Sequence, residues 1–197
     1  LSLAYIDTLR AYKRVLKQRN AALKENARDL LSVLDPQLAR YGLALMAARR
    51  SLFERFQRDF PGLYESVARL GRRVDVDYSP SWPAEASPDS VLELLDARRE
   101  SELILGTTRS GPHRDRWGFR CCGESFTDKA STGQLRLVSL ILRVVEARAY
   151  AEAAAQEAGG PRWPVFLIDD VLLELDVGRR RRFLELLPGP EENAQIF

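Results

Sequence analysis

The sequence predicts an α/β protein in which a long helical lobe precedes part of a sheet-containing lobe. Near the amino terminus, apolar residues such as Leu9, Tyr12 and Leu16 recur at three- and four-residue steps, which is typical of an amphipathic helix. Residues 165–168 form a continuous apolar run, which is typical of a strand buried on both faces. Of the 197 residues, 45% are hydrophobic and 29% are charged, so the chain can bury a core and is not disordered overall.

Helices dominate the first hundred residues. The helical pattern first covers residues 4–34. Asp35 and Pro36 then supply an N-cap and a first-turn proline, which predict the start of a second helix. Pro61 is expected to end or kink that helix before a short helical segment that reaches residue 70. Two long helices joined by a short link indicate an antiparallel helical arm.

Strands and helices alternate in the rest of the chain. We expect strands at residues 74–78, 117–121, 165–168 and 194–197, and helices at residues 89–103, at residues 133–156 and from residue 177. Gly123 is expected to turn the chain after the second strand. The sequence therefore predicts a helical lobe at residues 1–105 and a partial α/β lobe at residues 106–197.

Composition excludes several classes of protein. The net charge of +2 gives no global electrostatic argument for a nucleic-acid partner. Cys121 and Cys122 are adjacent and the chain has one histidine, so we expect neither a loop-closing disulfide nor a zinc site. There is no signal-type segment and no apolar run of the roughly 18 residues that a bilayer span needs, which favours a cytoplasmic protein without a membrane partner. Because the chain begins at Leu1 without Met, we expect it to be a piece of a longer one.

Two carboxylates follow the apolar run at residues 165–168. Asp169 and Asp170 would lie at the carboxyl end of a strand, where open α/β sheets bind ligands. In P-loop enzymes the first such Asp holds Mg²⁺, usually through water, and the second acid polarises the attacking water. The alternative is an ordinary core strand that runs into an acidic turn.

A hydroxyl residue and a glycine begin the helix that precedes this strand. In the segment Ser131-Thr132-Gly133-Gln134, free backbone N–H groups and the positive end of the helix dipole would form an anion site. The alternative is a capping box, Ser-x-x-Gln, which needs no ligand. This helix start, the apolar strand, the acid pair and residues 173–176 follow the order of signature, Walker B and D-loop in ABC-type ATPases.

Longer motifs extend this pattern across nearly the whole chain. They are residues 12–21 (YKRVLKQRNA), residues 106–115 (GTTRSGPHRD) and residues 169–176 (DDVLLELD). On these motifs the chain resembles the RecF family of DNA-repair ATPases. The resemblance implies an ABC-ATPase-like P-loop fold, of which this chain holds the helical lobe and the Walker B half of the α/β lobe.

The resemblance also implies a function. Members of this family bind double-stranded DNA and single-strand/double-strand junctions, with ATP and Mg²⁺ as cofactors and as ATP-dependent homodimers. They help recombination mediator proteins to load recombinase at single-strand gaps. This places the expected activity in DNA replication, repair, recombination and the SOS response, at the nucleoid in the cytoplasm.

Individual residues acquire roles through the same resemblance. The signature residues, which would contact ATP held by the other subunit, are Ser131, Thr132, Gly133 and Gln134. The acids that would support Mg²⁺ through water and orient the attacking water are Asp169 and Asp170, respectively. The D-loop residues are Glu174 and Asp176.

The sequence departs from the family pattern at several positions. No glycine is followed by lysine, so the Walker A motif is absent, and we expect this chain alone neither to bind nor to hydrolyse ATP. Leu135 stands where the family tends to have a polar residue, and Leu173 stands where the D-loop usually has serine. Arg116 occupies a position that is often a second aspartate.

The hallmark segment of the family consists of Gly111, Pro112, His113, Arg114 and Asp115. We expect it to brace the helical lobe against the sheet, with a nucleotide-sensing role as the second interpretation. His113 is a candidate general base, but a lone histidine in a turn more often makes structural hydrogen bonds. Arg114 and Asp115 are a candidate ion pair that fixes the loop.

Basic residues near the amino terminus suggest a DNA contact. No acidic residue occurs between residues 8 and 24, and Arg10, Lys13, Arg14 and Lys17 share one helical face, which suits phosphate groups. A solvated face opposite the apolar stripe is the alternative. Two further functional classes also remain: a non-catalytic helical protein-interaction module, and a related chromosome-maintenance ABC ATPase, whose coiled-coil arm needs longer heptad patterns.

Overall fold

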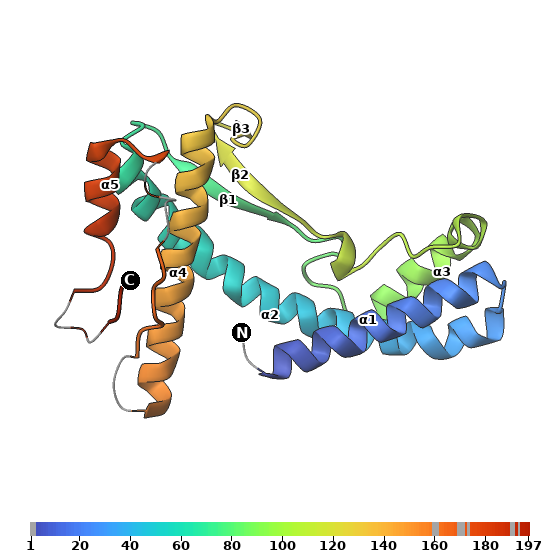
Figure 1. Cartoon of the computed structure of the whole chain (residues 1–197). Coiled ribbons are helices and arrows are strands. Elements are labelled where there is room, and N and C mark those ends of the chain that lie inside the picture. The colour runs from blue at the N-terminus through green and yellow to red at the C-terminus, as the bar shows by residue number, and fades with distance from the viewer. Residues whose placement is uncertain (1–2, 159–161, 169–171, 173, 190–191, 193) are drawn as a thin grey trace. The chain divides into compact units, whose positions relative to one another are not determined.

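The computed structural model describes residues 3–158, 162–168, 172, 174–189, 192 and 194–197 (Figure 1). The helices are α1 (Leu3–Lys24), α2 (Arg28–Ala68), α3 (Pro88–Leu105), α4 (Thr132–Ala158) and α5 (Val177–Leu184). The strands form a sheet in the order β1 (Val74–Ser79), β2 (Arg116–Cys121), β3 (Glu124–Ser125). Helices and a sheet share the chain, as the predicted α/β class requires. Within the described ranges, no helix is both long and apolar enough to cross a membrane.

The break between the first two helices lies earlier than the sequence predicted. α1 ends at Lys24, and Asn26 adopts a positive φ of 54° in the turn that follows, a conformation that asparagine tolerates better than most residues. Asp35 and Pro36 lie inside α2, so the predicted helix start at these residues is wrong. The Asp35 carboxylate is not a cap because it accepts a hydrogen bond from the buried Arg19 Nε at 2.6 Å.

α2 also continues through Pro61, where the sequence predicted an end or a kink. A proline removes one N–H from the helical ladder, and here the fully buried rings of Phe60 and Tyr64 on either side anchor the segment. The helix ends at Ala68, and the Glu65 carboxylate accepts the backbone N–H groups of residues 70 and 71 at 3.1 and 2.9 Å. The separate short helix expected before Gly71 is therefore the last part of α2.

The chain divides into two compact units, each built from two separate stretches of sequence. The first unit comprises Leu1–Phe53 and Tyr78–Trp117, and the second comprises Glu54–Asp77 and Gly118–Phe197. The sequence instead predicts a single boundary after residue 105, which lies within the first unit. That boundary rests on the change from helices alone to alternating helices and strands, and as a functional division it remains a prediction.

The core of the first unit is formed by α1, α2, α3 and the loop after β1. Its fully buried side chains include Tyr12, Leu38, Leu45, Trp82 and Leu95. Gly42 of α2 faces the Trp82 ring so closely that a Cβ at this position would overlap the ring atoms. A glycine within this long helix therefore allows the large indole to pack against the helix backbone.

The second unit has a separate aromatic and aliphatic core. α4 contributes the buried Leu137 and Ile141. The ring centroids of Phe60 and Tyr64 lie 5.5 Å apart, and those of Tyr64 and Phe126 lie 5.9 Å apart with an edge-on geometry. Burial raises the pKa of Tyr64 to about 12. These contacts connect the end of α2 to the segment that leads into α4.

β2 and β3 form a tight antiparallel hairpin. Cys121 pairs with Glu124, and the two residues between them, Cys122 and Gly123, have φ values of 54° and 82°. Two consecutive positive φ values are characteristic of a type I′ turn, whose twist matches that of the strands. The turn predicted at Gly123 is confirmed.

The apolar run before the acid pair is extended but not buried on both faces. Phe166 forms a parallel bridge with Ile196, and the Ile168 N–H donates to the Phe197 carbonyl at 2.8 Å. The side chains of Val165 and Leu167 are 57% and 79% exposed, so the prediction of a doubly buried strand is wrong for this chain. In the part of the chain that the structure describes, the paired neighbour is the segment at residues 194–197, and alternate side chains remain in solvent.

Candidate functional site

The amino-terminal end of α4 carries a reciprocal capping box. The Gln134 backbone N–H donates to Ser131 Oγ at 3.3 Å, and the Ser131 N–H donates to Gln134 Oε1 at 2.8 Å. The capping alternative considered for this segment is therefore present. It leaves the N–H groups of Thr132 and Gly133, which no carbonyl of the same helix can reach. Ser131 and Thr132 are exposed, so an external anion can approach these donors.

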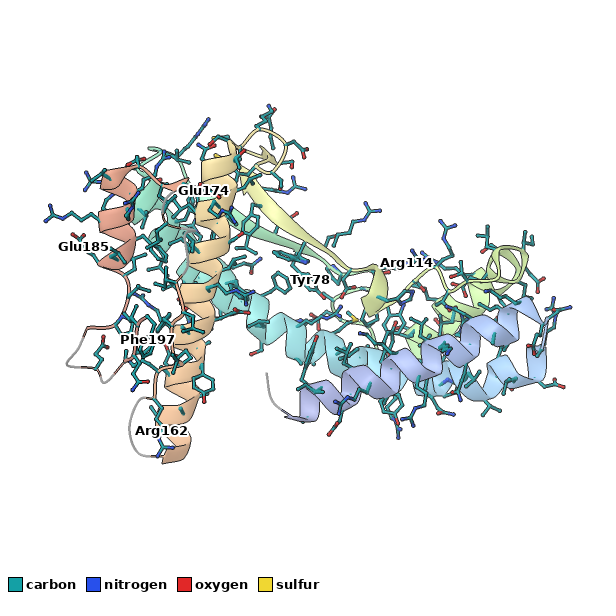
Figure 2. The ribbon with its side chains drawn as sticks, viewed as in Figure 1. Tyr78, Arg114, Arg162, Glu174, Glu185 and Phe197 are labelled. Atoms are coloured by element: carbon teal, nitrogen blue, oxygen red, sulfur yellow. The ribbon has the colours of Figure 1, made fainter. Side chains whose placement is uncertain are left out.

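The predicted D-loop lies against this helix end. A Cβ on Gly133 would sit 3.9 Å from the Glu174 carbonyl oxygen, which places the two segments in contact (Figure 2). Arg136, one turn into α4, donates two hydrogen bonds to the Glu174 carboxylate, including Nε to Oε2 at 2.9 Å. These bonds hold the pKa of Glu174 below its usual value. Arg136 thus offsets a negative charge that would otherwise repel an anion at the start of α4.

Asp176 has a structural role as the N-cap of α5. Its Oδ1 accepts the Arg179 backbone N–H at 2.8 Å, and this hydrogen bond lowers the pKa of Asp176. Arg180 returns from α5 and donates to the carbonyl oxygens of Leu172 and Leu175 at 3.1 and 3.3 Å. The segment that contains Glu174 is therefore held from both sides by arginines.

The acid pair Asp169 and Asp170 lies outside the described residues, as does Leu173. Among the residues that are described, no cluster of three or more His, Cys, Asp or Glu side chains could hold a metal ion. The assignment of Asp169 to Mg²⁺ and of Asp170 to the attacking water therefore stays a prediction.

The hallmark segment forms a hydrogen-bonded turn in the first unit. Tyr12 Oη lies 2.7 Å from His113 Nδ1, and His113 Nε2 lies 3.2 Å from the Thr108 carbonyl oxygen. Since a carbonyl only accepts, Nε2 carries the proton, and Nδ1 accepts from the tyrosine. Desolvation lowers the pKa of His113, which favours this neutral form. Both ring nitrogens are occupied, which fits the structural interpretation of this histidine rather than a general base.

Asp115 is the centre of a second cluster in the same segment. Its Oδ2 accepts from Arg49 Nη1 and from Tyr78 Oη, both at 2.7 Å, and its Oδ1 accepts from the Ser81 N–H at 2.9 Å (Figure 2). The expected ion pair between Arg114 and Asp115 is wrong, because Arg49 of α2 takes the position of the cation. Desolvation and the Asp115 carboxylate together raise the pKa of Tyr78.

Gly111 makes the close packing of this segment possible. Its φ is 127°, and a Cβ would lie 2.6 Å from Tyr12 Oη and 3.2 Å from the Trp82 ring. Its N–H donates to Ser81 Oγ at 3.0 Å, and the neighbouring Pro112 is buried. These contacts support the expectation that the segment has a structural role.

Arg19 was missed as a structural residue. It is fully buried, and its guanidinium donates to Asp35 and Glu102 at 2.6 Å and to Thr108 Oγ1 at 2.8 Å. The sequence did carry a signal, because Arg19 lies four residues from the buried Val15 and is therefore on the apolar face of α1. The residue links α1, α2 and α3 with Thr108, which lies in the loop before the hallmark segment.

The four candidate DNA-contacting side chains are exposed on α1. They are Arg10, Lys13, Arg14 and Lys17. Arg10 makes an exposed ion pair with Asp7 at 3.4 Å. Exposure agrees equally with a phosphate-binding surface and with an ordinary solvated face, so the DNA contact remains a prediction.

Comparison with known proteins gives one consistent result. Over 184 residues the chain is 39% identical to the DNA replication and repair protein RecF of Treponema pallidum, which covers 93% of this chain and 50% of that protein. Over 196 residues it is 35% identical to RecF of Stenotrophomonas maltophilia, covering 98% of this chain and 50% of that protein. The chain belongs to the RecF family.

Solved structures support the same assignment for the fold. The structure of a recombination mediator protein RecF with ATP, described as part of the RecFOR pathway, matches the whole of this chain with a TM-score of 0.78 and 26% identity. This match confirms the predicted fold class, a part of the RecF ABC-ATPase fold. The chain spans about half the length of the relatives it matches, 50% of the Treponema protein and 52% of the solved chain. A scan against protein-family models gave no match.

Proposed function

We propose that this chain supplies the signature, Walker B and D-loop segments of a RecF-like ATPase. The complete protein would bind DNA as an ATP-dependent homodimer and help recombination mediator proteins to load recombinase at single-strand gaps. The observation that carries the proposal is the exposed start of α4 with the predicted D-loop packed beside it. The structure of a related RecF with ATP supports ATP as the nucleotide.

The start of α4 suits a phosphate group for electrostatic reasons. The N–H groups of Thr132 and Gly133 point out of the helix end, where the dipole favours negative charge. Ser131 Oγ lies beside them and is exposed. The nearby Glu174 carboxylate is paired with Arg136, so it opposes an incoming anion less than an unpaired acid would. In a dimer, this end of the helix would contact the γ-phosphate of ATP held by the partner subunit.

The remaining catalytic roles fall on the acid pair. In the complete protein Asp169 would support Mg²⁺ through water, and the ion would neutralise charge on the phosphates. Asp170 would orient the attacking water as the catalytic residue. Glu174 and Asp176 would shape the dimer interface, since Asp176 caps α5 and Glu174 is tied to α4.

The substitution Ser131→Asp separates the phosphate contact from the cap. Aspartate caps helices as well as serine does, so the fold is expected to persist. The added negative charge should repel the partner's γ-phosphate and weaken ATP-dependent dimerisation of the complete protein by at least about tenfold, equivalent to about 1.4 kcal/mol. Sedimentation velocity with ATP and Mg²⁺ measures this, alongside a hydrolysis assay.

Ser139→Asp is the matched control, because Ser139 is an exposed serine of the same helix. It should dimerise as the unsubstituted protein does. Normal dimerisation of Ser131→Asp would mean that Ser131 acts only as a helix cap. It would also remove the main support for a signature that acts in trans.

We further propose that the exposed basic face of α1 contacts the phosphates of double-stranded DNA or of a single-strand/double-strand junction. Its members are Arg10, Lys13, Arg14 and Lys17. Reversing all four to Glu in the complete protein should weaken DNA binding and reduce its salt slope by about 0.9 for each phosphate that the protein no longer neutralises. Reversing the exposed Arg143 and Arg181 of the second unit is the control. If the salt slope of DNA binding were unchanged, the four α1 residues would be an ordinary solvated face and not a DNA contact.

A further inference from the structure

Two adjacent thiols lie at the tip of the β2–β3 hairpin and have no part in the proposed ATPase function. Cys121 is the last residue of β2 and is half-buried, and Cys122 is the first residue of the type I′ turn and is exposed. Both are free, and their sulfur atoms lie 3.9 Å apart. The hairpin therefore presents a dithiol at a surface that a small ligand can reach.

The turn fixes the two sulfurs on a backbone that cysteine does not favour. Type I′ turns prefer glycine, asparagine or aspartate at the position of Cys122, because φ is positive there. Cys122 nevertheless adopts a φ of 54°, and Gly123 follows with 82°. The pairing of Cys121 with Glu124 and the bond from the Phe126 N–H to the Phe119 carbonyl at 2.8 Å hold the hairpin on both sides of the turn.

The sulfur separation fits a bridging atom better than a direct bond. Two thiolates bound to one tetrahedral ion at about 2.3 Å each lie about 3.8 Å apart. A disulfide requires about 2.0 Å between the sulfurs and normally joins Cα atoms at least about 4.4 Å apart. Adjacent Cα atoms across a trans peptide are only about 3.8 Å apart. The two thiols are in weak hydrogen-bond contact at 3.9 Å, a separation that a chelated ion could span with little movement of either sulfur.

We propose that Cys121 and Cys122 form a two-thiolate chelating site for soft, thiophilic ions, with trivalent arsenic as the probe. Sulfur ligands select soft ions over hard ones. Among the described residues no third His, Cys, Asp or Glu joins the pair in a metal-binding cluster, so a closed four-ligand zinc site is not built here. The ion that fits this site needs two sulfur ligands from the protein and takes its remaining ligand from another molecule.

The reaction with phenylarsine oxide is balanced without any oxidant. Each thiol forms one S–As bond, and the oxide oxygen leaves as water with both thiol protons. Arsenic stays trivalent and both sulfurs stay reduced. The proposal does not depend on the ATPase function, so its test is independent of the experiments on Ser131.

Intact-mass measurement of the folded 197-residue chain tests the site. One phenylarsenic group should add per chain, survive excess monothiol and be removed by a dithiol. Cys121→Ser and Cys122→Ser should each weaken retention by about 100-fold, because the second sulfur binds as an intramolecular ligand. Retention in either single variant equal to that of the unsubstituted chain would overturn the proposal.

A third variant tests whether the fold builds the site. Gly123→Val leaves both thiols in place but disfavours the positive φ on which the turn depends. Circular dichroism confirms that the rest of the chain is folded. Weaker retention than in the unsubstituted chain supports a site organised by the hairpin. Equal retention would assign the chelation to any pair of adjacent cysteines and contradict the proposal.

Discussion

At the scale of single residues, the stability of the first unit depends on buried ion pairs. Arg19 has no exposed surface, and its two acidic partners, Asp35 and Glu102, are almost equally buried. Asp35 also accepts from Arg99, and Glu102 accepts the Arg109 backbone N–H at 2.5 Å. Desolvation makes such a network costly to break at any one member, because the remaining charges lose their compensation.

Arg19→Met should therefore destabilise the chain by about 3–5 kcal/mol, since it leaves the buried Glu102 carboxylate without its cation and Asp35 with Arg99 as its remaining basic partner. Urea unfolding monitored by circular dichroism measures the loss. The control is Arg28→Met, which removes an exposed ion pair with Glu100 and should have a much smaller effect. A loss at Arg19 no larger than that at Arg28 would contradict the importance of the buried network.

His113 gives the chain a pH dependence whose sign is fixed by its environment. Its folded pKa is lowered by desolvation, so the unfolded chain binds a proton more readily than the folded one. The stabilising contribution is present above the unfolded value of about 6.5 and is lost as pH falls through the range below it. Protonation would also prevent Nδ1 from accepting the Tyr12 hydrogen bond.

The chain has one histidine, so the effect can be isolated. Urea midpoints at pH 7.5 and at pH 5.5 should differ more for the unsubstituted chain than for His113→Gln. The same loss of stability in both chains between these two pH values would mean that His113 does not titrate at a lowered pKa.

Residue roles were predictable where a residue acts locally and unpredictable where its partner is distant in sequence. The capping box of Ser131 and Gln134 spans three positions and was considered from sequence alone. The pairing of Asp115 with Arg49 joins residues 66 positions apart, and the adjacent Arg114 was the wrong choice. Nothing in the sequence near Arg136 indicated that it would bind Glu174.

At the scale of elements, α2 shows that proline and N-cap residues predict helix ends less reliably than tertiary packing determines them. Two prolines suggested breaks in this segment, yet one helix runs from Arg28 to Ala68. Asp35 and Pro36 are typical of a helix start. In the fold, however, the Asp35 carboxylate is buried and accepts a hydrogen bond from Arg19 instead of capping a helix. The break between α1 and α2 lies instead at the turn that contains Asn26, which has a positive φ. The turn at Gly123 and the start of α4 were predicted well because turn and cap geometry favour particular residues, whereas the short strand β3 after the turn was not predicted.

Two glycines of α2 offer a matched test of that packing. Gly42→Ala should destabilise the chain by about 1–3 kcal/mol, because the new methyl group meets the Trp82 ring. Gly62→Ala has open space around the new methyl group and should be stabilising by about 0.5–1 kcal/mol through helix propensity. Thermal or urea unfolding of both variants measures the difference. A similar effect of both substitutions would mean that Trp82 does not pack against Gly42.

At the scale of the whole molecule, the proposed function requires this chain to act on a nucleotide that another subunit holds. The family and the fold class were predictable from the sequence because they depend on local patterns. The burial of the strand at residues 165–168 was not, because it depends on neighbouring strands, and the described chain pairs this strand with residues 194–197. Because the chain has no Walker A motif, the signature residues at the start of α4 should contact ATP only when another subunit holds the nucleotide.

The most direct test of this account is sedimentation of the labelled 197-residue chain with and without the complete protein. By itself the chain should bind no ATP, because it lacks the phosphate-binding loop. With the complete protein and ATP it should co-sediment as a mixed dimer, and the same chain with Ser131→Asp should not. Association that is independent of ATP, or equal for both chains, would contradict a signature that acts in trans.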